Sequence, residues 1–191
     1  MNQDLVTATR RHLNARQAET VQKIIDAARE ELRDVGFETL TIRSVAGRAS
    51  VAPATAYTYF SSKHHLIVEI FWRLINERGR QEIDLPTPRD RVCAVFADLA
   101  QLLAGEPELG AATTVALLGS DPDVRQLRYL IGVEINNRIA DAIGPKPNAQ
   151  LLDALSLAWS GAMLQAGMGH SDYKQMGKRL VTATKLLMAD A

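Results

Sequence analysis

The sequence predicts an all-α fold of about nine helices. Apolar residues recur every three or four positions through nearly the whole chain, and no stretch of any length shows the alternation typical of a strand. Short breaks rich in Gly, Pro and Asp separate the periodic segments. We expect a small N-terminal helical unit, residues 1–65, followed by a larger helical unit, residues 66–191.

The first predicted helix covers residues 16–35, where apolar side chains at spacings of three and four form one stripe. Asn14 and Gln17 stand three positions apart at its start, which is the spacing of a capping box. Gly36 follows the last apolar position, and glycine is typical of helix C-termini.

Three further helices are predicted before residue 80. Thr41 is the N-cap of the first, whose small and branched residues form an inner face. The second covers residues 53–60 and begins at Pro53, where the missing N–H costs nothing. The third begins after Ser62 and directs Leu66 inward.

Five helices are predicted in the remainder of the chain. Thr87 marks the start of one that ends near residue 103, and the segments GEP and GSDPD bracket a short one. The next spans residues 122–143. Residues 148–168 are apolar nearly all round, as in a helix buried between layers or subunits. An amphipathic helix follows GMGHSD and ends the chain.

Composition excludes several classes of protein. The longest apolar segment, LLDALSLAWSGAMLQAGM, is interrupted by polar residues, so no membrane span is predicted. Cys93 is the only cysteine, which excludes an internal disulfide and fits a reducing cytoplasm. His170 and Cys93 are far apart in sequence, and no metal-ligand or triad spacing accompanies them. We therefore predict no enzyme activity, no cofactor and no metal.

Charge is distributed unevenly although the net charge is zero. Residues 1–66 contain nine basic and seven acidic side chains, a balance of +2, and the remainder has a balance of −2. This weak asymmetry is compatible with an N-terminal unit that contacts phosphate. Arg10, Arg11 and Arg16 form a basic arm that either reaches a minor groove or remains a solvated tail, and the sequence leaves both open.

Residues 41–60 have the pattern of a helix-turn-helix. Two short helices are separated by ASVA, and Ala46, Ala49 and Ala52 supply the small side chains that two closely packed helices require. Lys63 and the free backbone amides near Ser61 and Ser62 lie at the next helix start, which is a natural phosphate site.

The stretch GFETLTIRSVAGRASVAPATAYTYFSSKHHL resembles the TetR family of bacterial transcription regulators. The shared pattern is a Gly that ends the first helix, a capping Thr, an Ile/Val-Ala pair and a recognition helix. Tyr, an aromatic-Phe pair and Ser-Lys close it. The resemblance implies contacts to double-stranded DNA, mostly to phosphates. The implied DNA-binding residues are Thr41, Arg43, Ala54, Thr55, Tyr57, Thr58, Tyr59, Lys63 and His64.

Three positions within the helix-turn-helix, and two after it, depart from the family pattern. Ser50 stands where the family usually has Gly in the turn, and a Cβ makes a left-handed conformation costlier there. Ala52 lacks a hydroxyl that often binds phosphate, and Ala54 replaces a Gly. His64 and His65 replace acidic residues and are expected to be solvated, or to add a phosphate contact.

The family resemblance also implies a ligand cavity and a dimer interface in the C-terminal unit, for which the residues allow candidates. The candidate ligand-binding residues are Phe96, Leu99, Leu103, Thr113, Leu117, Tyr129, Asn136, Trp159 and Met163. The candidate dimer residues are Leu152, Leu155, Met163, Met176, Leu180 and Leu187.

The leading hypothesis is a cytoplasmic, ligand-responsive repressor. It binds a palindromic operator as a homodimer and is released by a small hydrophobic effector. The alternative is a ligand-independent regulator, or an activator, on the same fold.

Overall fold

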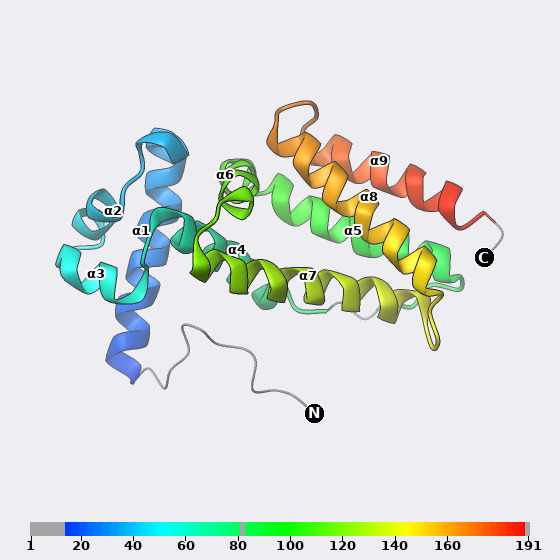
Figure 1. The fold of residues 1–191 in the computed structure, drawn as a ribbon, viewed down its shortest axis with the longest axis horizontal. Helices are drawn as coiled ribbons and strands as arrows, with labels where there is room; N and C mark the ends of the chain where they lie inside the picture. Colours follow the sequence, from blue (N-terminus) through cyan, green and yellow to red (C-terminus); the bar gives the residue numbers. More distant parts are fainter. Residues whose placement is uncertain (1–13, 81–82, 190–191) are drawn as a thin grey trace.

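The computed structural model describes residues 14–80 and 83–189, and within these ranges the chain forms nine α-helices and no strand (Figure 1). The all-α prediction is therefore confirmed. In chain order the helices are α1 (Ala15–Thr39), α2 (Ile42–Arg48), α3 (Pro53–Tyr59), α4 (Lys63–Arg78), α5 (Pro88–Ala104), α6 (Pro107–Leu118), α7 (Pro122–Ile143), α8 (Ala149–Gly167) and α9 (Tyr173–Leu187).

Most helix starts are fixed by the side chains that the sequence indicates. Asn14 accepts from the amide of Gln17, whose side chain accepts from the Asn14 amide in return, and this completes the predicted capping box. Thr41 caps α2 in the same way with Ser44, and Ser62 caps α4. These bonds satisfy amides that have no partner within the first turn of a helix.

Gly36 interrupts α1 as its sequence position predicts. Its φ of 73° lies in the left-handed region, and the residues on either side are helical. One further turn follows before Leu40, whose amide donates to the Gly36 carbonyl at 3.2 Å. The bend lets the fully buried Leu40 join the interior between α1 and α2.

The helices separate into two groups along the molecule. Helices α1–α3 lie at one end in Figure 1, and α5, α8 and α9 lie at the other. Helix α5 packs on α9, and α9 packs on α8. Between the two groups, α4 packs mainly on α6 and α7, and α6 also contacts α1.

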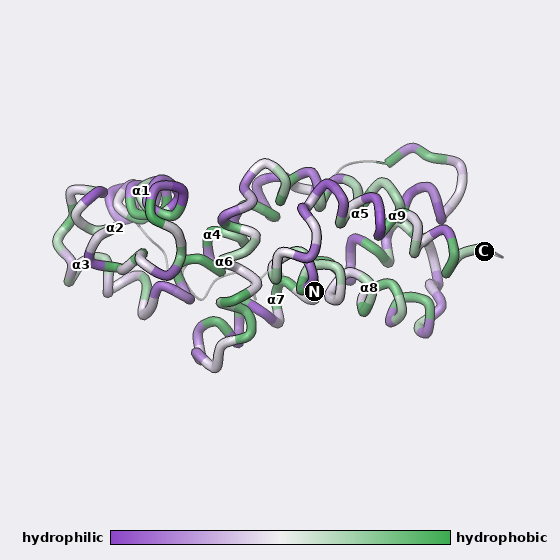
Figure 2. Tube along the Cα trace, turned by 90° about the horizontal axis from the view of Figure 1, so that it is seen from above, coloured by the Kyte–Doolittle hydropathy of each residue, from purple (hydrophilic) through white to green (hydrophobic). Residues whose placement is uncertain are grey.

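Each end of the molecule has an apolar interior. Hydrophobic and hydrophilic positions alternate along the helices in Figure 2, as expected when each helix turns one side inward. Ile24, Val45 and Phe60 fill the interior among α1–α3. Among the C-terminal helices the rings of Phe96 and Trp159 are stacked, with centroids 6.1 Å apart. No helix of the described residues is long and apolar enough to cross a membrane.

Candidate DNA-binding surface and ligand cavity

Helices α2 and α3 are joined by a tight turn. The amide of Val51 donates to the Ala46 carbonyl at 3.0 Å, and that of Ser50 donates to Gly47 at 3.1 Å. Ser50 has a φ of 55°, so the predicted left-handed conformation is present at a residue with a Cβ. Ala46 of α2, which packs on α1 and α3, is fully buried. Ala52 is the N-cap of α3, and its side chain makes no capping hydrogen bond.

The outer side of this pair of helices carries most of the predicted DNA-binding residues. Exposed residues are Thr41, Arg43, Ala54, Tyr57 and Thr58, and half-buried residues are Thr55, Tyr59, Lys63 and His64. Tyr57 is 53% exposed, an unusual degree for a large aromatic side chain. The exposed residues come from α3, from α2, on which α3 packs, and from the cap of α2.

Lys63 has acceptors inside the protein. Its Nζ donates to the carbonyl of Phe37 at 2.9 Å and to that of Glu38 at 3.1 Å. The ammonium also lies 4.6 Å from the centre of the Phe37 ring. It therefore satisfies carbonyls at the C-terminal end of α1. Its contact to phosphate stays a prediction.

The two adjacent histidines have different surroundings. His64 is half-buried, with its ring edge-on to Phe37 at a centroid distance of 5.3 Å. His65 is 7% exposed, so the expectation that it is solvated is wrong. Its ring faces Phe60, and its Nδ1 accepts from the Ser61 amide at 3.3 Å. The sequence HH alone does not reveal that His65 is buried, because the groups that contact its ring lie in the turn before α4.

Two hydroxyl–carboxylate bonds join the start of α4 to the start of α7. The Ser61 Oγ donates to Asp123 at 2.6 Å, and the Ser62 Oγ donates to Asp121 at 2.6 Å. Burial alone would raise the pKa of Asp121, but bonds from Ser62 and from two backbone amides hold it below its ordinary value. The hydroxyls of Ser61 and Ser62 thus bind carboxylates of the same chain. The phosphate site predicted from the sequence concerns the backbone amides near these two serines.

An ion pair joins α1 to the start of α6. The Arg29 guanidinium donates through Nε to Glu106 at 3.2 Å and through Nη2 to the second carboxylate oxygen. Both side chains are largely buried. Sequence reasoning missed this pair because Arg29 and Glu106 are separated by 77 residues. The start of α6 is therefore held to α1, and the start of α7, which follows α6, is held to the turn before α4.

A cavity of about 460 Å³ lies between α6, α7 and α8. Its walls are mostly apolar. Predicted ligand-binding residues within it are Leu117, Asn136, Trp159 and Met163. The other lining residues are Thr114, Leu118, Arg128, Ile131, Gly132, Ile135, Ser156, Ser160 and Leu164.

Two of the polar residues that line this cavity, Arg128 and Asn136, belong to α7. Arg128 Nη2 donates to the Gly119 carbonyl at 2.6 Å. Eight residues further along α7, Asn136 accepts from Ser156 of α8. At 1.5 Å per residue these two positions are about 12 Å apart along α7, and the lining residues Ile131 and Ile135 lie between them.

Five predicted ligand-binding residues lie elsewhere. Phe96, Leu99, Leu103 and Thr113 are buried in the protein interior. Tyr129 is 68% exposed and does not line the cavity. Helical periodicity identifies the inward side of a helix, but it does not say whether that side meets a neighbouring helix or a void.

The predicted dimer residues need a similar correction. Leu155, Met163, Met176 and Leu180 are buried within the protomer, so their side chains have almost no surface to offer a second copy. Leu152 is half-buried, and Leu187 is 45% exposed. The apolar residues that α8 and α9 do expose are Leu157, Leu164, Met168, Leu186 and Leu187.

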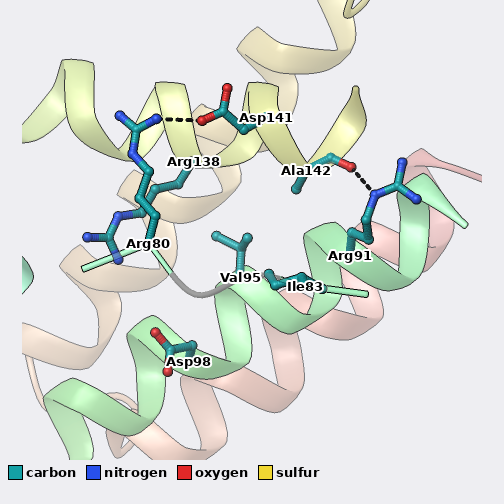
Figure 3. A pocket seen from close by; sticks show the side chains of 8 residues that line it. All are labelled: Arg80, Ile83, Arg91, Val95, Asp98, Arg138, Asp141 and Ala142. Atoms are coloured by element: carbon teal, nitrogen blue, oxygen red, sulfur yellow. Dashed lines mark hydrogen bonds and ion pairs between the residues drawn. The ribbon is translucent and has the colours of Figure 1, made fainter. Parts of the chain in front are cut away.

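A second cavity, of about 340 Å³, lies beside α5 and α7 (Figure 3). Its walls carry Arg80, Arg91 and Arg138, but each guanidinium already has partners. Arg80 binds Glu134 and Asp141, Arg91 donates to the Ala142 carbonyl at 2.8 Å, and Arg138 donates to Glu134 at 2.8 Å. Arg80 and Arg138 are thus paired with carboxylates, whereas among the described residues the Arg91 guanidinium is held by backbone carbonyls alone.

Metal binding has no support among the residues that the structure describes. Residues 14–80 and 83–189 contain no group of three or more His, Cys, Asp and Glu side chains that could hold a metal ion. The predicted DNA-binding residues and four of the predicted ligand-binding residues therefore define two candidate sites, the outer side of α2 and α3 and the cavity between α6, α7 and α8.

Known proteins are similar to this chain over most of its length. Residues 24–70 match the family model described as bacterial regulatory proteins, tetR family. An uncharacterised HTH-type transcriptional regulator of Mycobacterium tuberculosis is 45% identical over 181 residues, which are 93% of this chain and 84% of that protein. The HTH-type transcriptional repressor KstR of the same organism is 28% identical over 91% of this chain and 83% of that protein.

Solved structures share the fold. A TetR transcriptional regulator from Rhodococcus sp. RHA1 has a TM-score of 0.78 at 23% identity, over 93% of this chain and 98% of that one. FadR of Thermus thermophilus, a TetR family repressor in complex with lauroyl-CoA, has a TM-score of 0.64 at 19% identity, over 88% of this chain and 93% of that one.

Proposed function

The chain belongs to the TetR family of bacterial transcriptional regulators, and from this premise we propose that it is a ligand-responsive repressor. The observation that carries the proposal is the cavity between α6, α7 and α8, because one of its walls, α6, is bonded to α1 at its start and leads into the start of α7, which is bonded to the turn before α4. The family consists of transcriptional regulators, so an enzyme function is set aside.

Residues 1–65 are proposed as the DNA-binding unit. Helix α3 is the second helix of the helix-turn-helix, and such a helix lies in the major groove. Residues 66–191 then form the unit that binds the effector and the second copy. Helix α4 belongs by its contacts to this second unit, since it packs mainly on α6 and α7.

The repressor is proposed to act as a homodimer through α8 and α9. These two helices pack against each other, and each keeps large apolar side chains exposed, among them Leu157 and Leu186. A second copy would remove this surface from water. Two copies of α3 at a fixed separation would then match a two-fold-symmetric operator.

The effector is proposed to be hydrophobic with a polar or anionic end. A volume of 460 Å³ falls within the range of about 300–1,000 Å³ that is usual for small-molecule sites. Arg128, which lines the cavity, can attract an anionic group, and the apolar lining residues suit a hydrocarbon. Since the FadR structure contains lauroyl-CoA, this compound is a suitable first probe.

Release of DNA would proceed through α6. Thr114, Leu117 and Leu118 of this helix line the cavity, so an occupant that fits better when α6 has moved favours the moved state. The Arg29–Glu106 pair and the serine–aspartate bonds would transmit the movement to α1 and α4. The two copies of α3 would then no longer match the operator spacing.

The function is tested in two steps. Selection from random double-stranded DNA should recover a palindromic site whose affinity falls steeply with salt. A thermal-shift experiment should then show stabilisation by lauroyl-CoA and none by free CoA at the same concentration. The variant Gly132→Leu fills the cavity at a position where a Cβ meets no atom within 4 Å. It should bind DNA normally and lose the shift.

Two results would contradict the proposal. Failure to select any DNA would exclude a DNA-binding function for the homodimer. If lauroyl-CoA stabilised Gly132→Leu as much as the unmodified protein, the cavity between α6, α7 and α8 would be excluded as the effector site. A regulator that binds its operator and responds to no ligand is the alternative, and DNA selection without any thermal shift would favour it.

A further inference from the structure

The recognition helix α3 has an unusual composition for a surface that reads DNA. Its sequence, PATAYTY, contains no Arg, Lys, Asn, Gln, Asp or Glu. Those are the side chains that make bidentate or accepting hydrogen bonds to base edges in the major groove. Specific contacts from α3 must therefore use small apolar groups, hydroxyls or tyrosine.

The exposed side of α3 is formed by Ala54, Tyr57 and Thr58. Their spacing of three and four residues places them on one face of the helix. All three are exposed. Ala56, on the opposite side of α3, and Phe60, which follows α3, are fully buried. The residues that can meet base edges are thus largely fixed by the packing of α3 on α1 and α2.

The Thr58 hydroxyl is turned back onto its own helix. Its Oγ1 donates to the Ala54 carbonyl at 3.0 Å, as β-branched threonine often does in helices. Because the hydroxyl is engaged there, the methyl group is the branch that remains to face outward. Next to the Ala54 Cβ it extends a small apolar patch one helical turn long.

We propose that α3 recognises thymine through its C5-methyl group, which the methyl groups of Ala54 and Thr58 contact in the major groove. This inference rests on the proposed DNA-binding function. The C5-methyl of thymine is the apolar group that the major-groove edge of a base pair presents, and Ala and Thr methyls are suited to it. Tyr57 flanks the patch, and its exposed hydroxyl can donate to a base or a phosphate.

The test uses the selected operator with thymine replaced by deoxyuridine, one position at a time. This change removes only the C5-methyl group and keeps every hydrogen-bonding atom of the base. Fluorescence anisotropy at fixed salt should show about fourfold weaker binding for each thymine that faces α3, from the loss of one buried methyl. Substitution in both half-sites should weaken binding by about 15-fold.

Two variants assign the effect to Thr58. Thr58→Ser keeps the hydroxyl and removes the methyl, so it should bind the thymine operator about fourfold more weakly and lose its response to deoxyuridine at the contacted position. Thr58→Val removes the hydroxyl and keeps a methyl, so it should retain both the affinity and the response. Circular dichroism and thermal unfolding establish that both variants fold.

Equal affinity for the thymine and deoxyuridine operators at every position would overturn the inference and leave the proposed function intact. An unchanged deoxyuridine response in Thr58→Ser would also overturn the role of the Thr58 methyl. Failure to select any DNA would overturn the inference together with the proposed function.

Discussion

The Lys63 ammonium lies against the C-terminal end of α1, where it donates to the carbonyls of Phe37 and Glu38. Lys63→Ala should lower the free energy of unfolding by about 1–2 kcal/mol, because two charge-assisted hydrogen bonds are lost from a partly exposed site. Arg43→Ala, on the exposed side of α2, should leave thermal stability unchanged.

DNA binding distinguishes the two residues further. If Arg43 contacts one phosphate, Arg43→Ala should lower the slope of log affinity against log salt by about one unit. Lys63→Ala should weaken binding with a smaller change of slope, since its charge is engaged within the protein. A large loss of slope in Lys63→Ala with full stability would show that phosphate is its main partner.

Ser50 carries backbone strain in the turn between α2 and α3. A left-handed conformation costs a residue with a Cβ about 1–2 kcal/mol, and glycine avoids that cost. Glycine also gives the unfolded chain more conformational freedom, which lowers the free energy of unfolding by about 0.4–1 kcal/mol. Ser50→Gly should therefore raise the free energy of unfolding by up to about 1 kcal/mol. Ser50→Ala keeps the Cβ and should give no gain, and urea titration compares the three proteins. Lower stability of Ser50→Gly would contradict the account.

At the level of the helices, α6 and α9 approach closely at Gly110. A Cβ built on Gly110 would stand 2.5 Å from the Tyr173 ring. Gly110→Ala should therefore destabilise the protein by about 1–3 kcal/mol through overpacking. Gly132→Ala is the matched control, since its Cβ would meet no atom and alanine favours a helix by about 1 kcal/mol. Thermal unfolding should move in opposite directions in the two variants.

The burial of Tyr173 at this contact makes the stability of the protein depend on pH in alkaline solution. Burial raises the pKa of Tyr173 to about 12 from an ordinary value of 10, with Thr114 acting weakly in the opposite direction. Because the folded-state pKa is the higher one, the stabilisation is complete below pH 10 and is lost as pH rises from 10 to 12. Tyr173→Phe should show a shallower loss of thermal stability over this range. Identical alkaline profiles would contradict the burial of the hydroxyl.

Helix boundaries were predictable because their signals are local. Asn14, Thr41, Ser62 and Thr87 each cap the helix that their sequence position indicates. The contacts between helices were not predictable in this way. Ser62 and Asp121 are 59 residues apart, and either would cap a helix whether or not they met. The same limit applies to the predicted ligand-binding residues, of which Leu117 and Trp159 line the cavity, whereas Phe96 and Leu99 lie in the interior.

At the level of the whole molecule, the proposed function requires the bonds around α6 to connect effector binding with DNA binding. The Arg29–Glu106 pair holds the start of α6 to α1, and Asp121 and Asp123 hold the following segment to α4. These bonds join polar side chains, so they can be removed without opening the packing of α4 on α6 and α7. Asp121→Asn combined with Asp123→Asn should therefore leave both binding sites in place and reduce the coupling between them.

The dissociation constant for the operator, measured with and without saturating lauroyl-CoA, tests this coupling most directly. The account predicts that lauroyl-CoA raises the constant by about 5–150-fold, and that operator DNA raises the constant for lauroyl-CoA by the same factor. The double aspartate variant should show a smaller factor in both directions. An unchanged operator constant, at a lauroyl-CoA concentration that stabilises the protein against heat, would contradict the account.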